Sequence, residues 1–387
     1  MHVASTATTA GRWQARQASV GILSTYPPTP CGLATFSAAL AGGLERQGAD
    51  VRVVRLADGS SPTGDRVVGE LVNGSSSSLA ASSDLLNDCD VAVIQHEYGV
   101  YGGPDGDEVL EVLRALRVPS IVIAHTVLAE PTPHQQAVLE AIAEIANCVV
   151  VMSDAARQRL CTRFDVSPGK VETIPHGAAV PRRSAMPSGA APALLTWGLV
   201  GPGKGIERVI DAMPRLHALP GRPHYIVAGS THPKVLAADG EAYRTARIAQ
   251  AERLGVADSV TFDSTYRDVA TLTALIQSAA VVVLPYDSRE QATSGVLVDA
   301  IAAGRPVVAT AFPHAVELLA SGAGLVVNHD DLDAMTEALH RILTRPDLAA
   351  SMAAEASRLA PTLSWDVVAG DYRRLTDRLI IQPAALV

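Results

Sequence analysis

The chain has 387 residues, 48% of them apolar and 18% charged, a composition typical of a globular protein, and its length favours two domains over one. A formal net charge of -9 argues against nucleic acid as the main partner, because phosphate binding draws its affinity from a cationic surface. The chain has no apolar run long enough to span a membrane and its four cysteines form no C-x-x-C pair, so we expect a cytoplasmic protein without a zinc site or a strong membrane signal.

The first segment, residues 1–17, is rich in Ser, Thr, Ala and Arg and contains no acidic residue. It lacks the apolar block of a secretory signal. Transit peptides share this composition with plain disordered tails, and we favour a disordered leader.

A first domain is predicted over residues 18–180, where short valine- and isoleucine-rich runs alternate with stretches of helical period. Strands are expected at 20–25, 51–56, 91–95, 120–125, 148–153 and 171–175, and helices at 34–47 and 105–116. The Gly/Ser-rich stretch 74–83 is expected to be a surface loop.

A linker is predicted at 181–192, because the stretch 176–192 has three prolines and no apolar periodicity. A second domain follows over 193–362. Its strands are expected at 194–200, 224–229, 260–264, 280–286, 306–310 and 324–327, and its helices at 206–216, 241–254, 269–278, 296–303 and 331–343. The last part, 363–387, has helical spacing over 365–379, and we expect it to pack back on the first domain.

The alternation predicts an α/β protein made of two doubly wound, Rossmann-like parallel-sheet domains. Parallel sheets bind ligands at the carboxyl ends of their strands, and clefts between domains favour the same use. The informative residues should therefore follow strands.

The loop 198–205, Gly-Leu-Val-Gly-Pro-Gly-Lys-Gly, lies between a predicted strand and a predicted helix. Its glycines let backbone N–H groups approach an anion, the helix start adds a positive dipole, and Lys204 adds a point charge. Lysine is scarce here, with three against twenty-eight arginines. The loop suits a diphosphate, although a glycine-rich turn with a solvated lysine has the same pattern.

Two further junctions have the same character. Gly32 precedes the first predicted helix, where a glycine also serves simple turning. Ser294 and Gly295 open a helix in which Asp299 lies about one turn on, so its carboxylate is placed to accept hydrogen bonds from sugar hydroxyls. An acid near a helix start is also favoured by the dipole alone.

These pieces together resemble the retaining glycosyltransferases of family four, which have the GT-B fold with two domains facing a central cleft. The resemblance rests on G-x-x-x-x-x-K-G at 198–205, P-x-x-x-x-x-Q-x-x-S-G-x-x-x-D-A-x-A-x-G-x-P-V-V-A-T at 285–310, and I-P-x-G at 174–177, with His176 in the variable place. It covers about residues 19–379. It implies a nucleoside diphosphate sugar held by the second domain, an acceptor held by the first, and no cofactor or metal.

The resemblance also assigns roles. Donor-binding residues would be Gly32, Gly201, Gly203, Gln291, Ser294, Gly295, Val296 and Asp299. Lys204 would be catalytic, and so would His125, because similar enzymes place a histidine there near the transferred sugar. A lone histidine after a strand is otherwise most often structural.

The sequence departs from the family in two places. Leu199 replaces the arginine that pairs with the donor diphosphate, and Gln291 and Asp299 stand where the family has two glutamates, with Glu290 one position off register. Arg289 or Arg267 is the candidate for the missing cation.

Residues 95–103 resemble a segment found in a subset of the family associated with mannosyl transfer. His96, Glu97 and Tyr98 would then contact a carbohydrate or polyol acceptor, and GDP-mannose would be the donor. A turn with a buried histidine is the alternative. A nucleotide-sugar epimerase and a non-catalytic nucleotide- or glycan-binding relative are the competing functions.

Overall fold

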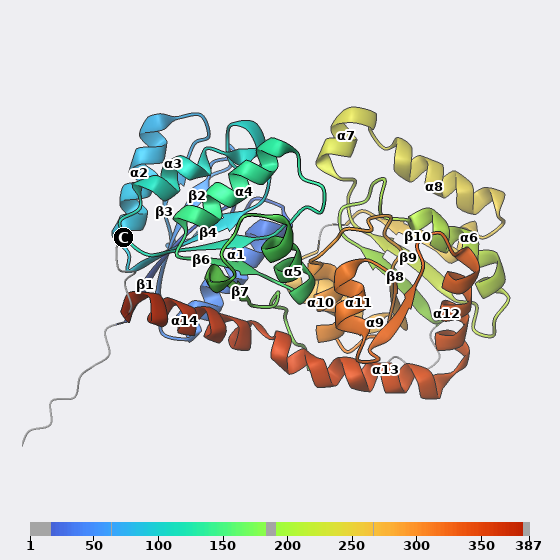
Figure 1. The fold of residues 1–387 in the computed structure, drawn as a ribbon. Coiled ribbons are helices and arrows are strands. Elements are labelled where there is room, and N and C mark those ends of the chain that lie inside the picture. Colours follow the sequence, from blue (N-terminus) through green and yellow to red (C-terminus); the bar gives the residue numbers. More distant parts are fainter. Residues whose placement is uncertain (1–16, 63, 183–190, 266, 382–387) are drawn as a thin grey trace, which may run out of the picture.

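The computed structural model describes residues 17–62, 64–182, 191–265 and 267–381, which form two α/β domains lying side by side (Figure 1). Nearly all of the predicted leader and most of the predicted linker fall at 1–16 and 183–190, outside the described residues.

The first domain is built on a parallel sheet which, within the described residues, has seven strands in the order β3-β2-β1-β4-β5-β6-β7. The strands are β1 (Ser19–Ser24), β2 (Asp50–Leu56), β3 (Val67–Leu71), β4 (Val91–His96), β5 (Ser120–Ala124), β6 (Cys148–Val151) and β7 (Val171–Thr173). The chain order reverses between β1 and β4. Doubly wound sheets bind ligands at such a switch point, beyond the carboxyl ends of the strands.

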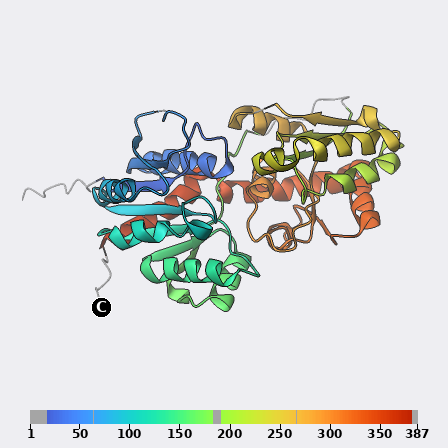
Figure 2. The same cartoon turned by 90° about the horizontal axis from the view of Figure 1, so that it is seen from above.

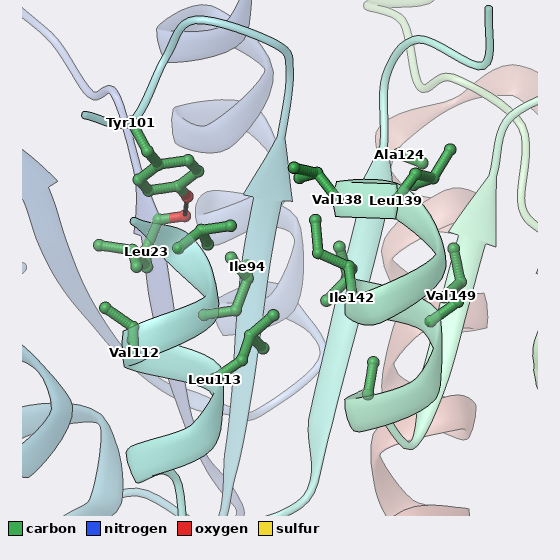
Figure 3. Packing of buried hydrophobic residues seen from close by; sticks show 14 of the residues in the cluster. Leu23, Ile94, Tyr101, Val112, Leu113, Ala124, Val138, Leu139, Ile142 and Val149 are labelled. Atoms are coloured by element: carbon green, nitrogen blue, oxygen red, sulfur yellow. Dashed lines mark hydrogen bonds between the residues drawn. The ribbon is translucent and has the colours of Figure 1, made fainter. Parts of the chain in front are cut away.

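Helices cover both faces of this sheet because alternate strand residues point to opposite sides. Val20 and Ile22 face one helix layer and Leu23 faces the other. The first layer contains α1 (Gly32–Arg46) and α14 (Trp365–Ile381), and the second contains α2 (Ser76–Asn87), α3 (Val109–Ala115), α4 (Pro133–Ile145) and α5 (Asp154–Arg163). Figure 3 shows α3 and α4 packing their apolar side chains onto the strands.

The second domain repeats this plan, with six strands among its described residues in the order β10-β9-β8-β11-β12-β13. The strands are β8 (Ala193–Trp197), β9 (His224–Ala228), β10 (Val260–Asp263), β11 (Val281–Leu284), β12 (Val307–Thr310) and β13 (Gly324–Val327). The helices are α6 (Ile206–His217), α7 (Pro233–Asp239), α8 (Ala242–Arg253), α9 (Val269–Ser278), α10 (Gly295–Ala302), α11 (Pro313–Leu319), α12 (Leu332–Thr344) and α13 (Pro346–Leu359). The switch point here lies between β8 and β11.

The chain crosses between the domains at two neighbouring places. Ala178 donates its N–H to the carbonyl of Leu363 at 2.7 Å, and the N–H of Trp365 donates back to the carbonyl of Ala178 at 3.3 Å. After the second crossing, α14 lies against α1, where Arg46 Nε and Asp366 Oδ1 are 2.7 Å apart. The C-terminal helices therefore extend across both domains (Figures 1 and 2).

One prediction is wrong: the expected surface loop at 74–83 contains the start of α2. Ser75 caps this helix by accepting a hydrogen bond from the N–H of Ser78, and Leu79, Ser82, Ser83 and Leu86 are buried at helical spacing. The small serines let the helix lie close to the sheet. Among the described residues, no helix is both long enough and apolar enough to cross a membrane.

Candidate active site

The loop that joins β8 to α6 is shaped by its glycines, and at Gly205 a neighbouring carbonyl leaves no room for a side chain. Gly198, Gly203 and Gly205 have φ angles of 110°, 89° and 65°, in the region that side chains disfavour. A Cβ atom on Gly205 would lie 1.7 Å from the carbonyl oxygen of Pro285, and one on Gly229 would lie 2.0 Å from the carbonyl oxygen of Gly198. The glycines thus bring this loop against the segments that follow β9 and β11.

Lys204 is the charged group of this loop. Its Nζ lies 4.6 Å from the ring centroid of Tyr286, which follows β11. In the described part of the chain, no carboxylate lies within ion-pair distance of this amine. The amine faces a cavity of about 360 Å³ lined by Leu199, Gly201, Pro202, Gly203, Lys204, His232, Lys234, Val235, Tyr286, Ser288 and Gln291. An ammonium group without a carboxylate partner, beside glycine residues that leave the backbone N–H groups accessible, is suited to binding an anion.

The start of α10 faces the first domain. Ser294 caps the helix by accepting a hydrogen bond from the N–H of Leu297, and its own N–H donates to Nδ1 of His314 at 2.8 Å. A Cβ on Gly295 would lie 2.8 Å from Nε2 of His176, so only glycine fits between the domains here. Val296, next along, packs its half-buried side chain on the core of the second domain. Gln291 lines the Lys204 cavity, and its amide donates to the carbonyl of Thr293.

Asp299 lies one turn into α10 and is half-buried. Burial raises the pKa of its carboxyl to about 7. Among the described residues, no group donates a hydrogen bond to this carboxylate. A carboxylate in this setting gains from a ligand that brings hydroxyl donors.

We expect Asp299→Ala to weaken nucleotide binding roughly tenfold, because a hydrogen bond to a charged group contributes about 1.5–3 kcal/mol. Isothermal titration calorimetry measures the dissociation constant directly. Asp333→Ala is the matched control, since its side chain is 87% exposed and pairs with Arg215 on the surface. An unchanged constant in Asp299→Ala would remove the role assigned to this carboxylate.

On the first domain, His125 directly follows β5 and is held by Gln95 of β4. The His125 Nε2 and Gln95 Oε1 atoms are 2.6 Å apart, and the Phe36 ring packs edge-on against the imidazole, with centroids 4.9 Å apart. Burial, followed by the charges of His176 and His96, lowers the pKa of His125 to about 3. His125 is therefore a neutral imidazole whose orientation is set by a buried amide. Gln95 begins the 95–103 segment, but no role was predicted for it, because its contact with His125 joins the ends of two different strands.

The three predicted acceptor residues occupy different environments. His96 is completely buried, and among the described residues neither of its ring nitrogens has a hydrogen-bond partner. Glu97 accepts a hydrogen bond from the Thr126 hydroxyl at 2.6 Å, and burial raises the pKa of its carboxyl. The Tyr98 hydroxyl donates to the carbonyl of Gln135 at 3.2 Å. Glu97 and Tyr98 are only half-buried, whereas His96 lies behind them.

A second cavity of about 260 Å³ lies between the two domains. Its lining comes from the loop at the start of α1 (Pro30, Cys31, Gly32, Thr35), from the β8 and β9 ends, and from Thr265, Arg267, Val269 and Leu272. Nothing lies within 4 Å of a Cβ built on Gly32, so this glycine leaves open space. Leu199 lines both this cavity and that of Lys204, so the two are neighbours. The interdomain cavity, with its largely apolar lining, therefore adjoins the cavity that carries the positive charge of Lys204.

The two arginines proposed as the missing cation both have carboxylate partners. Arg289 pairs with Asp330, and Arg267 pairs with Asp263. Arg267 lines the interdomain cavity, whereas Arg289 lies on a separate surface hollow beside residues 328–333.

Two family models match the chain. The model described as "Glycosyltransferase Family 4" matches residues 30–180, and the model "Glycosyl transferases group 1" matches residues 191–345. The chain is a family-four glycosyltransferase. The two matches divide where the structure places the first crossing between domains, and the second includes the Lys204 loop and α10.

Solved structures of glycosyltransferases share the two-domain GT-B fold. HepE from Anabaena, in complex with UDP and glucose, has a TM-score of 0.74 and 17% identity, over 94% of this chain and 100% of that one. Sucrose-phosphate synthase from Thermosynechococcus elongatus has a TM-score of 0.71 and 18% identity, over 94% and 100%. A UDP-forming trehalose-phosphate synthase from Burkholderia xenovorans has 0.68 and 14%, over 93% and 99%. No curated protein sequence matches this glycosyltransferase significantly.

The histidines near the domain interface make this glycosyltransferase sensitive to acid. Burial lowers the pKa of His96, His176 and His314 to about 4, and that of His125 to about 3. Below the unfolded value of about 6.5, the unfolded chain binds protons that the folded chain does not, so stability falls as pH falls. Asp299 and Glu97, whose folded pKa values are raised, act in the opposite direction, but they are two groups against these four histidines.

We therefore expect the free energy of unfolding to fall between pH 6.5 and pH 4, by up to about 1.4 kcal/mol per pH unit for each histidine. Denaturant melts at pH 7.5 and pH 5 measure the effect. His96→Leu removes a buried ring whose nitrogens have no partners among the described residues, and should reduce the acid sensitivity. An acid response identical to that of the unaltered protein would contradict the assignment to His96.

Proposed function

We propose that this glycosyltransferase transfers a sugar from a nucleoside diphosphate sugar to a hydroxyl group of a carbohydrate or polyol, with retention of configuration at the anomeric carbon. The observation that carries the proposal is the Lys204 loop: an ammonium group without a carboxylate partner in the described structure, beside glycine backbone, facing a cavity at the switch point of the second sheet. The diphosphate occupies this cavity. The nucleoside occupies the neighbouring interdomain cavity near Gly32 and Arg267.

In this mechanism the second domain binds the donor and the first domain presents the acceptor. Lys204 and the amides of the loop stabilise the negative charge that grows on the diphosphate as the glycosidic bond breaks. The neutral imidazole of His125 hydrogen-bonds the sugar, and the leaving phosphate accepts the proton of the acceptor hydroxyl on the same face of the ring. Closure of the two domains around the bound donor excludes water that would otherwise hydrolyse it.

The identity of the donor is a separate question. The segment 95–103 predicts GDP-mannose, whereas the HepE structures contain UDP or UDP-glucose. Thermal-shift measurements with GDP, UDP and ADP distinguish these donors, because a ligand that binds the folded state raises the melting temperature. We expect one of the three to do so, and a melting temperature unaffected by all three would contradict the proposal.

The corresponding nucleotide sugar then serves in a product assay with and without glycan and polyol acceptors. Transfer should depend on the acceptor, and nuclear magnetic resonance of the product should show the anomeric configuration of the donor. Binding without turnover across the acceptor panel would favour a non-catalytic relative. An inverted product would contradict the same-face mechanism.

A further inference from the structure

Two of the three lysines of this chain line one cavity. Lys204 comes from the β8–α6 loop and Lys234 from α7, and both face the 360 Å³ cavity beside Gly201 and Gly203. The third lysine, Lys170, donates from its amine to the carbonyl oxygens of Ala143 and Glu144 at a helix end. In a chain with twenty-eight arginines, this concentration of compact ammonium groups marks the cavity as a site for a small anion.

Lys234 is available for a ligand. In the described residues, its amine makes neither an ion pair nor a hydrogen bond. Arg267 and Arg289, the arginines considered above for the missing cation, are already paired with Asp263 and Asp330. The unpaired positive charge of the donor cavity therefore comes from the two lysines.

Two observations bear on the position of Lys234, one at the start of α7 and one on the first domain. The backbone N–H of Lys234 donates to Nδ1 of His232 at 3.1 Å, which fixes the first turn. Burial raises the pKa of Glu97 in the first domain, and hydrogen bonds and the positive charge of Lys234 oppose that rise. The positive charge of Lys234 therefore acts on Glu97 of the first domain, while its side chain lines the cavity of the second. Figure 1 shows α7 on the side of the second domain nearest the first.

We propose, on the basis of the function proposed above, that Lys234 supplies the second positive charge that binds the donor diphosphate. The Lys234 ammonium group thus replaces the positive charge of the family arginine, whose place is occupied by Leu199 in this chain. Lys204 approaches the diphosphate from the loop and Lys234 approaches it from α7, so the two ammonium groups bind the anion from different elements. The charge of Lys234 favours the ionised form of Glu97 across the cleft, although the two side chains make no ion pair in the described structure.

The test is calorimetric titration of the variants with UDP and UMP and with GDP and GMP. Lys234→Ala should weaken diphosphate binding at least about fivefold relative to monophosphate binding, because a charge-assisted hydrogen bond to a phosphate is lost. Lys234→Arg should keep the ratio within about threefold, since the charge is retained. Arg215→Ala, which removes an exposed positive charge elsewhere in the second domain, should leave the ratio unchanged.

The outcomes separate this inference from the proposed function. If the unaltered protein binds none of UDP, GDP and ADP, both proposals fail. If it binds one of them and Lys204→Ala weakens binding while Lys234→Ala does not, only the present inference fails. A loss of the diphosphate preference in Arg267→Ala or Arg289→Ala, but not in Lys234→Ala, would likewise assign the second charge to an arginine.

A purely structural role for Lys234 predicts a different pattern. If the lysine acted only by pairing with Glu97 across the cleft, Glu97→Gln would reduce the ratio of diphosphate to monophosphate affinity as much as Lys234→Ala. We expect Glu97→Gln to leave the ratio at least as high as in the unaltered protein, because the substitution removes a negative charge that would oppose a bound anion. Equal losses in the two variants would overturn the proposal.

Discussion

Lys204→Ala should reduce turnover at saturating donor by at least about tenfold, because the ammonium group stabilises charge that develops on the leaving diphosphate. The fold should be unaffected, since the Lys204 amine is only half-buried and contacts the Tyr286 ring without an ion pair in the described structure. The measurement is kcat together with the melting temperature of the variant.

Lys204→Arg is the matched variant, because it keeps the charge but changes its shape and reach. It should be intermediate in turnover. Arg215→Ala controls for loss of a positive charge outside the site, where the side chain is 65% exposed. A Lys204→Ala variant with unchanged kcat would show that the bond-breaking step does not use this residue.

Gly205→Ala should lower the free energy of unfolding by about 3 kcal/mol and abolish nucleotide binding. The new Cβ would lie 1.7 Å from the carbonyl oxygen of Pro285, so the β8–α6 loop must move away from the segment after β11. That movement displaces Lys204, the preceding residue. Denaturant melts and calorimetry with the nucleoside diphosphate measure the two effects.

Gly203→Ala separates steric overlap from backbone strain. Gly203 also has a positive φ of 89°, but nothing lies within 4 Å of its Cβ position. Its substitution should therefore cost only the strain of a left-handed alanine, about 1 kcal/mol. Equal destabilisation by the two substitutions would contradict the account of why the loop is so rich in glycine.

Much of the fold could be predicted from the sequence because its buried strands are uninterrupted valine- and isoleucine-rich runs. These runs predicted the strands of both domains except β3. This strand lies at the edge of the first sheet, and its first four residues alternate between half-buried and exposed. Helix α2 was mistaken for a loop because its serines favour turns, although Leu79 and Leu86 are spaced for one helix face. Helices α4, α5, α7, α11 and α13 were not predicted.

The candidate site was predictable where its residues follow strands in recognisable motifs. The 198–205 loop, His125 and the start of α10 all lie at the carboxyl ends of strands, as expected. The pairing of His125 with Gln95, the contact of His176 with Gly295 and the position of Lys234 join distant parts of the chain. Such contacts depend on the packing of two domains, which local patterns do not specify.

The most direct test of the account is a crystal structure of the protein with the nucleoside diphosphate that raises its melting temperature. We predict phosphate oxygens within about 3 Å of Nζ of Lys204 and of the backbone nitrogens of the 201–205 loop. A diphosphate bound elsewhere, with this loop and its lysine in contact only with solvent, would contradict the central claim.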